Sequence, residues 1–274
     1  MMLSAEEVQQ YHADGYLIKR QFFSREESQR LLEKSRSDKV LQESAIRRDD
    51  KDGRTTKLTV WNHPIDDLYG MFSRNKRLVT AVEQLMGEPV YHYHSKIMLK
   101  EPRVGGAWEW HQDYGYWYKN GCLYPLMLSA MIAIDRATTD NGCLQVLKGS
   151  HHVGRVNHGV TGGQVGADMQ RVDAAVSRHE LIHCELEQGD VLFLHCNTLH
   201  KSAANLSDNP RWSYIIAYNA VRNDPLWEHH HASYTPLKTV DGNAIMQWKE
   251  DTGSSDHQAL IFNTDKDSGD RTED

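Results

Sequence analysis

The spacing of apolar residues predicts a helical first part of the chain, up to about residue 88. Ser4-Ala5-Glu6-Glu7 and Ser24-Arg25-Glu26-Glu27 each have the form of a capping box, a serine N-cap followed three residues later by a glutamate. Apolar residues then recur at helical spacing as far as Gly87, with an interruption at Asn75. These patterns predict helices at 4–13, 24–37 and 65–86, and short alternating strands at 16–18 and 57–61.

After residue 88 the pattern becomes rich in strands. Apolar and alternating runs predict strands at 90–99, 127–134, 143–147, 181–186, 191–195 and 212–221, separated by turn signals such as Asn141-Gly142 and Gln188-Gly189-Asp190. Short strands without intervening helices favour a β-sandwich or barrel over a βαβ fold. We expect one α+β domain, mainly β, over 1–250, with a helical part at 1–88 and a strand core at 89–222.

Two segments lack a regular period. Residues 154–172 contain five glycines and predict a long loop, and long loops in compact domains are usually functional or disordered. We take this loop as a lid over the site. Residues 251–274 are polar apart from one short apolar run, which predicts a flexible tail.

Composition excludes several functional classes. Net charge is −7 without a basic block, so we expect no nucleic-acid partner. There is no signal-peptide pattern at the start and no apolar run of membrane-spanning length, so we expect a cytoplasmic protein that does not enter a membrane. The four cysteines form no Cys-x-x-Cys pair, which argues against a zinc knuckle and favours reduced thiols.

Candidate chemistry begins at His111 and Asp113, which lie two residues apart between aromatic side chains. On an extended backbone such residues point to the same face, so an imidazole and a carboxylate can converge. One further histidine would complete the two-His, one-carboxylate triad of non-haem iron oxygenases. His195 and His200 both lie on a late apolar segment and could supply it, and alone the His-x-Asp pair is a weak signal.

Residues after His200 sharpen this prediction. Ser202 follows two positions later and Arg211 eleven positions later. An arginine offers a bidentate fork to a carboxylate such as the far end of 2-oxoglutarate, and a nearby hydroxyl can add a hydrogen bond. The order His-x-Asp, His-x-Ser, Arg therefore favours His200 over His195 and favours an oxygenase.

From about Glu6 to Trp227 the chain resembles the phytanoyl-CoA dioxygenase family of iron(II)/2-oxoglutarate enzymes. Motifs that carry the resemblance include Trp110-His111-Gln112-Asp113, Asp140-Asn141-Gly142-Cys143-Leu144, Lys148-Gly149-Ser150-His151 and His200-Lys201-Ser202. The resemblance implies a double-stranded β-helix, also called a jelly roll or cupin-like fold, with flanking N-terminal helices. A tryptophan at 117, shortly after Asp113, is similar to the ectoine hydroxylase branch.

Site residues follow from the resemblance by position. It implies that His111, Asp113 and His200 hold Fe(II). It implies that the co-substrate 2-oxoglutarate is bound by four residues: Lys57, His94, Ser202 and Arg211. Asp113 at the carboxylate position argues against a halogenase, because a halogenase needs that position open.

The substrate pocket is expected to be lined by aromatic residues. Tyr116, Trp117 and Tyr124 follow the His-x-Asp motif, and His92 is expected to share a strand face with His94. Such a lining suits a cationic group or an apolar body. The adjacent histidines 229–231 alternate in direction on an extended backbone, so we expect a surface or pocket-rim loop there and no metal site.

We therefore predict a dioxygenase that hydroxylates a small organic substrate while O2 converts 2-oxoglutarate to succinate and carbon dioxide. One alternative is a cupin-like hydrolase or isomerase that uses the same ligands with zinc. Another is a non-catalytic jelly roll that binds a ligand. The sequence leaves the substrate and the oligomeric state open.

Overall fold

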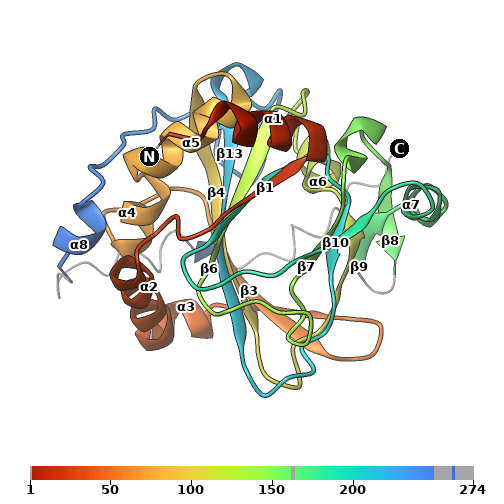
Figure 1. The fold of residues 1–274 in the computed structure, drawn as a ribbon, viewed down its shortest axis with the longest axis horizontal. Coiled ribbons are helices and arrows are strands. Elements are labelled where there is room, and N and C mark those ends of the chain that lie inside the picture. The colour runs from red at the N-terminus through yellow and green to blue at the C-terminus, as the bar shows by residue number, and fades with distance from the viewer. Residues whose placement is uncertain (1, 162–163, 250–260, 263–274) are drawn as a thin grey trace.

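Two antiparallel sheets face each other in the computed structural model, which describes residues 2–161, 164–249 and 261–262 (Figure 1). The larger sheet has the strand order β1-β11-β6-β13-β4-β3-β14, with β2 also paired to β3, and the smaller has the order β10-β7-β12-β5. This arrangement is the jelly roll that the family resemblance implies. The strands are β1 Tyr16–Lys19, β2 Ile46–Asp49, β3 Thr55–Trp61, β4 Val90–Lys100, β5 Trp108–His111, β6 Met127–Ala133, β7 Leu144–Leu147, β8 His158–Thr161, β9 Gln164–Ala167, β10 Leu181–Cys184, β11 Val191–His195, β12 His200–Ser202, β13 Arg211–Ala220 and β14 Ile261–Phe262.

The N-terminal helices and the last helix pack on the larger sheet, whereas two helices in the middle of the chain lie on the other side (Figure 1). The helices are α1 Ala5–Asp14, α2 Arg25–Ser37, α3 Lys39–Glu43, α4 Leu68–Ser73, α5 Lys76–Met86, α6 Asp113–Lys119, α7 Met169–Val176 and α8 Ala244–Gln247, with 3₁₀ turns η1 Ser150–Val153 and η2 Val221–Asn223. None of the helices within the described ranges is long and apolar enough to cross a bilayer.

Capping side chains define the N-terminal helices as the sequence predicts. Ser4 and Ser24 both form complete capping boxes, each accepting a hydrogen bond from the backbone N–H of the glutamate three residues later. Asn75 divides the third helical pattern because its side chain caps α5 by accepting from the N–H of Arg77. The apolar faces of α2, α4 and α5 then pack with the larger sheet into one core that includes Leu31, Phe72, Val82, Ile97 and Tyr214.

The glycine-rich segment 154–172 is not the aperiodic loop that we expected. It contains the hairpin of β8 and β9 and the start of α7. Register pairs His158 with Ala167 and Gly159 with Gly166, so two of the five glycines lie within the ladder. Glycine lacks a side chain that marks strand alternation, which is why the hairpin left no periodic signal.

The predicted tail at 251–274 lies largely outside the described residues. Within it the structure describes β14, which adds antiparallel to β3, with Ile261 opposite Trp61 and Phe262 opposite Val60. Ile261 and Phe262, the end of the short apolar run, therefore form a strand of the larger sheet.

Candidate active site

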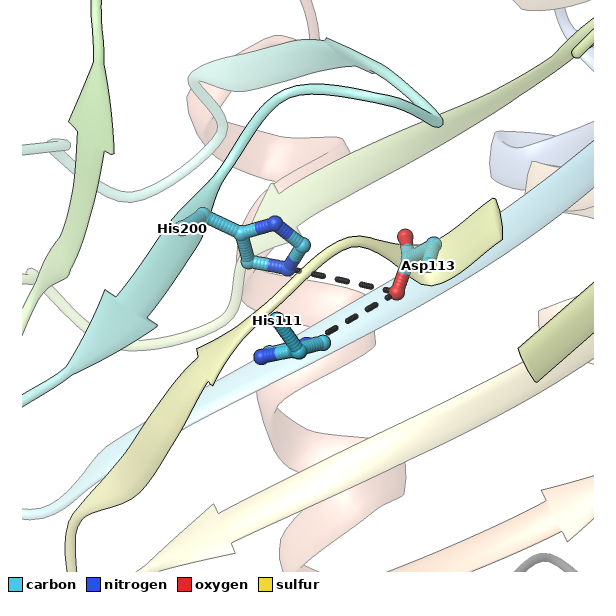
Figure 2. Close-up of side chains that lie close together, drawn as sticks. All are labelled: His111, Asp113 and His200. Carbon is cyan, nitrogen blue, oxygen red and sulfur yellow. Dashed lines mark ion pairs between the residues drawn. The ribbon is translucent and has the colours of Figure 1, made fainter. Parts of the chain in front are cut away.

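Three side chains meet between the sheets. His111 ends β5, His200 begins β12, and the two residues pair directly across the smaller sheet. Asp113 lies two residues after His111 and is the first residue of α6. Nε2 of each histidine lies 3.9 Å from Oδ1 of Asp113, as Figure 2 shows, and one donor atom from each residue lies within 4.8 Å of the other two.

The backbone is extended between His111 and Asp113, as the pairing of their side chains requires, and becomes helical at Asp113. Gln112 keeps extended backbone angles, φ −115° and ψ 135°, and a helix starts immediately after it. Because Gln112 is extended, His111 and Asp113 still project to the same side. Helix α6 then brings Tyr116 and Trp117 to the wall of the cavity that also contains the two histidines and Asp113.

Hydrogen bonds hold the three candidate ligands in place. Nδ1 of His111 lies 2.8 Å from the carbonyl oxygen of Glu109, and Nδ1 of His200 lies 2.9 Å from that of Thr198. A ring whose Nδ1–H donates to a carbonyl presents the lone pair of Nε2, the atom that faces Asp113. Ser129 donates to Oδ2 of Asp113 over 2.8 Å, which leaves Oδ1 facing the two imidazoles.

Burial keeps both imidazoles neutral and ready to bind a metal. Burial is the main cause that lowers the pKa of His111 well below its usual value, with His200 adding to it. Burial also lowers the pKa of His200. Two neutral imidazoles and one carboxylate are a donor set that suits divalent iron, so these residues fit the metal that the sequence predicts.

Gln112 ties the site to two neighbouring segments. Its side chain donates to the carbonyl oxygens of Gly154 and Asn197 over 2.8 and 2.7 Å, and it accepts from the N–H of Val156. Its backbone N–H donates to Nε2 of His158, a residue of β8. The β8–β9 hairpin is therefore fixed at its base to the residue between two candidate ligands.

A cavity of about 250 Å³ opens next to the candidate ligands. Its wall combines the iron-ligand candidates with a set of aromatic, apolar and cationic side chains from both sheets, α6 and β9. The lining residues that bear on the chemistry are Arg48, His94, Lys96, Met98, Trp108, Tyr116, Trp117, Gln164, Lys201, Ser202, Arg211 and Ile215.

A buried cationic group lies at one end of this cavity. Arg211 is only 4% exposed, donates through Nη2 to the carbonyl oxygen of Gly142 over 2.7 Å, and keeps a buried Nε without a hydrogen-bond partner among the described residues. Burial lowers the pKa of Arg211 to about 10, so it stays charged at neutral pH. Lys100, opposite Arg211 in the β4–β13 pair, donates to Oγ of Ser202 over 2.8 Å.

No carboxylate pairs with this group in the part of the chain that the structure describes. Burial, followed by the charge of Arg211, lowers the pKa of Lys100 well below its usual value. The charge of Asp50 acts on Lys100 and that of Asp135 acts on Arg211, but neither carboxylate forms an ion pair with them. Two adjacent buried basic groups without a contacting carboxylate favour an incoming anion. Arg211 and Ser202 line this part of the cavity, as the sequence predicts. Lys100, which the sequence prediction missed, lies beside them, and its ammonium donates to Ser202 and to the carbonyl oxygen of Ala203.

The prediction for Lys57 is not supported by the geometry. Lys57 pairs with Leu99 on β4, and Leu99 belongs to the core on the helical side of the sheet. The next residue, Leu58, lines the cavity in its place. Neighbouring residues of a strand point to opposite faces of the sheet. Because Leu58 faces the cavity, the side chain of Lys57 faces the helices on the other side of the sheet.

His92 is also placed away from the cavity, although His94 lines it. Register in the β4–β13 pair shifts between Ala217, opposite His94, and Tyr218, opposite His92. This bulge inserts an extra residue at 93, so positions 92 and 94 no longer share a face. Nε2 of His92 lies 2.8 Å from Oγ of Ser95, on the side where the helices pack.

Of the aromatic residues predicted to line the substrate pocket, two line the cavity and one does not. Tyr124 is 48% exposed and does not line the cavity, because it follows the end of α6 and turns outward beside Asn223. Tyr116 and Trp117 do line it, and the hydroxyl of Tyr116 donates to the carbonyl oxygen of Val165 on β9 over 2.6 Å. Close packing of α6 on the hairpin also requires a glycine at 115, since a Cβ there would lie 2.1 Å from the ring of His158.

Two further groups of histidines lie near the site without joining it. His195 ends β11 in the larger sheet, with its ring 5.1 Å from that of His151, so it is not brought to Asp113. His231 is buried and stacks on His94 with ring centroids 4.7 Å apart, and its Nδ1 lies 3.1 Å from Oδ1 of Asn62. The segment 229–231 therefore supports one wall of the cavity from behind.

Comparisons with known proteins agree with this geometry. The family model described as "Phytanoyl-CoA dioxygenase (PhyH)" matches residues 2–213. An L-proline trans-4-hydroxylase from Streptomyces griseoviridis is 30% identical over 179 residues, which are 60% of this chain and 67% of that protein. An ectoine dioxygenase from Bordetella bronchiseptica is 28% identical over 242 residues, 81% of this chain and 77% of that protein.

Solved structures share the fold. The crystal structure of EctD from S. alaskensis with bound Fe superposes with a TM-score of 0.72 at 21% identity and covers 88% of each chain. The carbocyclase SnoK from nogalamycin biosynthesis, described as a non-heme alpha ketoglutarate dependent enzyme, gives a TM-score of 0.62 at 21% identity and covers 85% of this chain and 97% of that one.

Proposed function

The chain belongs to the phytanoyl-CoA dioxygenase family and is an iron(II)- and 2-oxoglutarate-dependent dioxygenase, and on this premise we propose the roles of its individual residues. His111, Asp113 and His200 hold Fe(II) through two Nε2 atoms and one carboxylate oxygen. The observation that carries this assignment is the convergence of these three atoms within 4.8 Å at the wall of the cavity.

Arg211 and Ser202 bind the far carboxylate of 2-oxoglutarate, and Lys100 holds the hydroxyl of Ser202. The unpaired Nε of Arg211 supports this role, and neither Arg211 nor Lys100 forms an ion pair with a carboxylate in the described part of the chain. Arg211 supplies permanent charge and directional donors, and Ser202 supplies a hydroxyl held by Lys100. Fixing one end of the co-substrate in this way orients its keto-acid end toward the metal ligands.

The metal supplies redox chemistry when bound: O2 oxidises 2-oxoglutarate to succinate and carbon dioxide while a substrate C–H bond is hydroxylated. The protein contributes position and shielding. Ser129 holds one oxygen of Asp113 so that the other faces the metal position. Trp117, Tyr116 and His94 enclose the substrate side, where exclusion of water limits side reactions.

The cavity also limits the size of the substrate. Its volume of about 250 Å³ must hold both the co-substrate and the reacting part of the substrate. Drug-sized ligands occupy pockets of roughly 300–1,000 Å³, so a coenzyme A thioester does not fit inside. Hydroxylation of a small molecule, as in the relatives named for L-proline and ectoine, suits this space.

Cellular location and partners follow from the chemistry of the chain. We propose a cytoplasmic location, which the four unpaired and buried cysteines support, since reduced thiols persist in a reducing compartment. The proposed partners are the small substrate, 2-oxoglutarate and O2, without nucleic acid.

Succinate formation tests the proposed function directly. The purified protein, incubated with Fe(II), O2 and 2-oxoglutarate, should release succinate, and a substrate panel should raise that rate and yield a product heavier by one oxygen atom. Zinc in place of iron should give neither product. Succinate release that is independent of iron, or no release and no binding of 2-oxoglutarate, would contradict the assignment.

A further inference from the structure

The residue between two of the proposed metal ligands lies beyond the end of a strand ladder. β5 pairs with β12 as far as His111, which lies opposite His200. Gln112 follows, and because it is fully buried its backbone N–H needs a partner from elsewhere in the chain. That partner is Nε2 of His158, which accepts from the N–H over 2.9 Å and lies 46 positions later in the sequence.

This hydrogen bond bears on the direction of both ligands. The N–H of Gln112 belongs to the rigid peptide plane that joins it to His111, so a bond that fixes the plane also fixes the backbone angles beside it. Gln112 keeps φ −115° and ψ 135°, and this extended conformation projects His111 and Asp113 to the same side. Rotation of the peptide plane would therefore turn one ligand away from the other.

His158 is held so that its Nε2 accepts. Its Nδ1 lies 2.8 Å from the carbonyl oxygen of Val156, which only accepts, so Nδ1 carries the ring proton and Nε2 presents its lone pair to Gln112. Burial lowers the pKa of His158 to about 4, so the ring is neutral at pH 7. Close packing on Gly115, where a Cβ would lie 2.1 Å from the ring, fixes the imidazole further.

The second strand of the same hairpin contacts the chain on both sides of the two ligands. The side-chain oxygen of Gln164, on β9, accepts from the backbone N–H of Glu109 over 3.1 Å. The carbonyl oxygen of Val165 accepts from the hydroxyl of Tyr116 over 2.6 Å. The contact from His158 lies between these two along the chain, so the docked hairpin holds the ligand-bearing segment before, between and after its ligands.

We propose that His158 is a positioning residue for the metal, because its hold on the N–H of Gln112 keeps His111 and Asp113 aimed at one point. This inference rests on the proposed dioxygenase function and adds a residue to the machinery of that site. His158 does not line the cavity and acts only through the peptide of Gln112. Loss of the contact should therefore act first on metal binding.

Two amide substitutions separate the two hydrogen bonds of the ring. The amide of asparagine reaches about as far as Nδ1 and can keep the donation to Val156, whereas the amide of glutamine reaches about as far as Nε2 and can accept from Gln112. His158→Asn should weaken metal binding by about 10-fold to 100-fold, the usual effect of losing a group that orients a ligand. His158→Gln should stay within about threefold of wild type, because it keeps that group's function.

Titration with Co(II) in place of iron gives a readout that does not depend on turnover. Co(II) is added to the metal-free, full-length protein without 2-oxoglutarate, and its visible absorption reports both the affinity and the coordination geometry. In His158→Asn the spectrum at saturation should also differ from that of wild type, because one ligand is misaligned. A merely structural loss would lower the melting temperature and leave the spectrum of the bound metal unchanged.

His179→Asn is the matched control. His179 is half-buried, follows α7 and does not line the cavity. Its Nδ1 lies 2.8 Å from the carbonyl oxygen of Lys148, a bond that asparagine can also keep. The control should therefore bind Co(II) with the affinity and spectrum of wild type. Melting temperatures of all variants show that each is folded during the titration.

A second route displaces the ring without removing it. Gly115→Ala places a Cβ against His158 and should weaken Co(II) binding in the same direction as His158→Asn, which keeps the test open if His158→Asn does not fold.

Several outcomes would overturn the proposal. Wild-type affinity and spectrum in His158→Asn or in Gly115→Ala would do so. Equal losses in His158→Asn and His158→Gln would assign the effect to packing of the imidazole and not to its bond with Gln112. Failure of the wild-type protein to bind Co(II) or Fe(II) at all is a different result and would count against the proposed function.

Discussion

Replacement of Arg211 by alanine is expected to weaken 2-oxoglutarate binding steeply. The guanidinium is nearly fully buried, and its Nε has no partner within the described residues. A carboxylate bound there would exchange its hydration for a fork of charged donors. Without the arginine, that carboxylate would be buried with its ion-pair partner missing, a loss of about 2–5 kcal/mol.

The neighbouring lysine sets the expected magnitude within that range. Lys100 remains beside Ser202, and removal of Arg211 removes one of the two influences that hold the pKa of Lys100 low. A retained positive charge compensates part of the loss, so we expect about 2–3 kcal/mol, or roughly 30-fold to 150-fold in the dissociation constant. Arg211→Lys should fall between wild type and alanine, since lysine keeps the charge and lacks the fork.

Two measurements check this expectation. Anaerobic titration of the Fe(II) protein gives the affinity for 2-oxoglutarate, and thermal unfolding shows how much stability is lost with the hydrogen bond to Gly142. Arg103→Ala is the matched control, because Arg103 forms an exposed ion pair with Asp208 and does not line the cavity. If Arg211→Ala and Arg211→Lys both saturate at wild-type concentrations of 2-oxoglutarate, Arg211 does not anchor the co-substrate.

Further predictions concern the metal, the hairpin and pH. Asp113→Ala should abolish turnover and weaken iron binding with the fold intact, and His200→Ala should reduce activity far more than His195→Ala; equal losses in an iron-binding and succinate assay would argue against His200. We propose that 154–172 acts as a lid, so hydrogen exchange there should slow when 2-oxoglutarate and substrate are added with an inert metal; unchanged exchange would reject the lid. Burial lowers the pKa of His92 to about 3. As pH falls below about 6.5, the unfolded chain therefore binds a proton at this residue that the folded chain does not bind. At pH 5 this difference lowers the free energy of unfolding by about 2 kcal/mol. His92→Gln should therefore flatten the loss of stability between pH 6.5 and pH 5 in denaturant titrations, and an unchanged slope would show that His92 is not responsible.

Local sequence was sufficient wherever a structure depends on neighbours along the chain. The capping boxes at Ser4 and Ser24 and the division of a helix at Asn75 were readable because each depends on hydrogen bonds within a few residues. The spacing of His111 and Asp113 was informative for the same reason: one extended residue between them brings both side chains to one side, whatever element follows.

Tertiary structure decided which residues the cavity includes. The residues after His200 favoured it over His195, but the sequence could not show the strand pairing that separates them: β12 lies beside β5, and β11 belongs to the other sheet. Strand alternation predicts that His94 and Lys96 share a face, yet alternation cannot reveal which face is the cavity. Lys57 therefore fell on the wrong side by one residue.

The remaining differences arise from interactions between segments far apart in sequence. A bulge opposite β13 turned His92 away from the face of His94, and β4 alone carries no sign of it. One cationic group forms at the end of β4, where β12 and β13 return to it and bring Ser202 and Arg211 beside Lys100. Ser202 follows Lys100 by more than a hundred residues in the sequence. Their charges and pKa values depend on burial by that whole assembly, so the sequence determined the chemistry available to this protein, and the packing of the two sheets decided where each group acts.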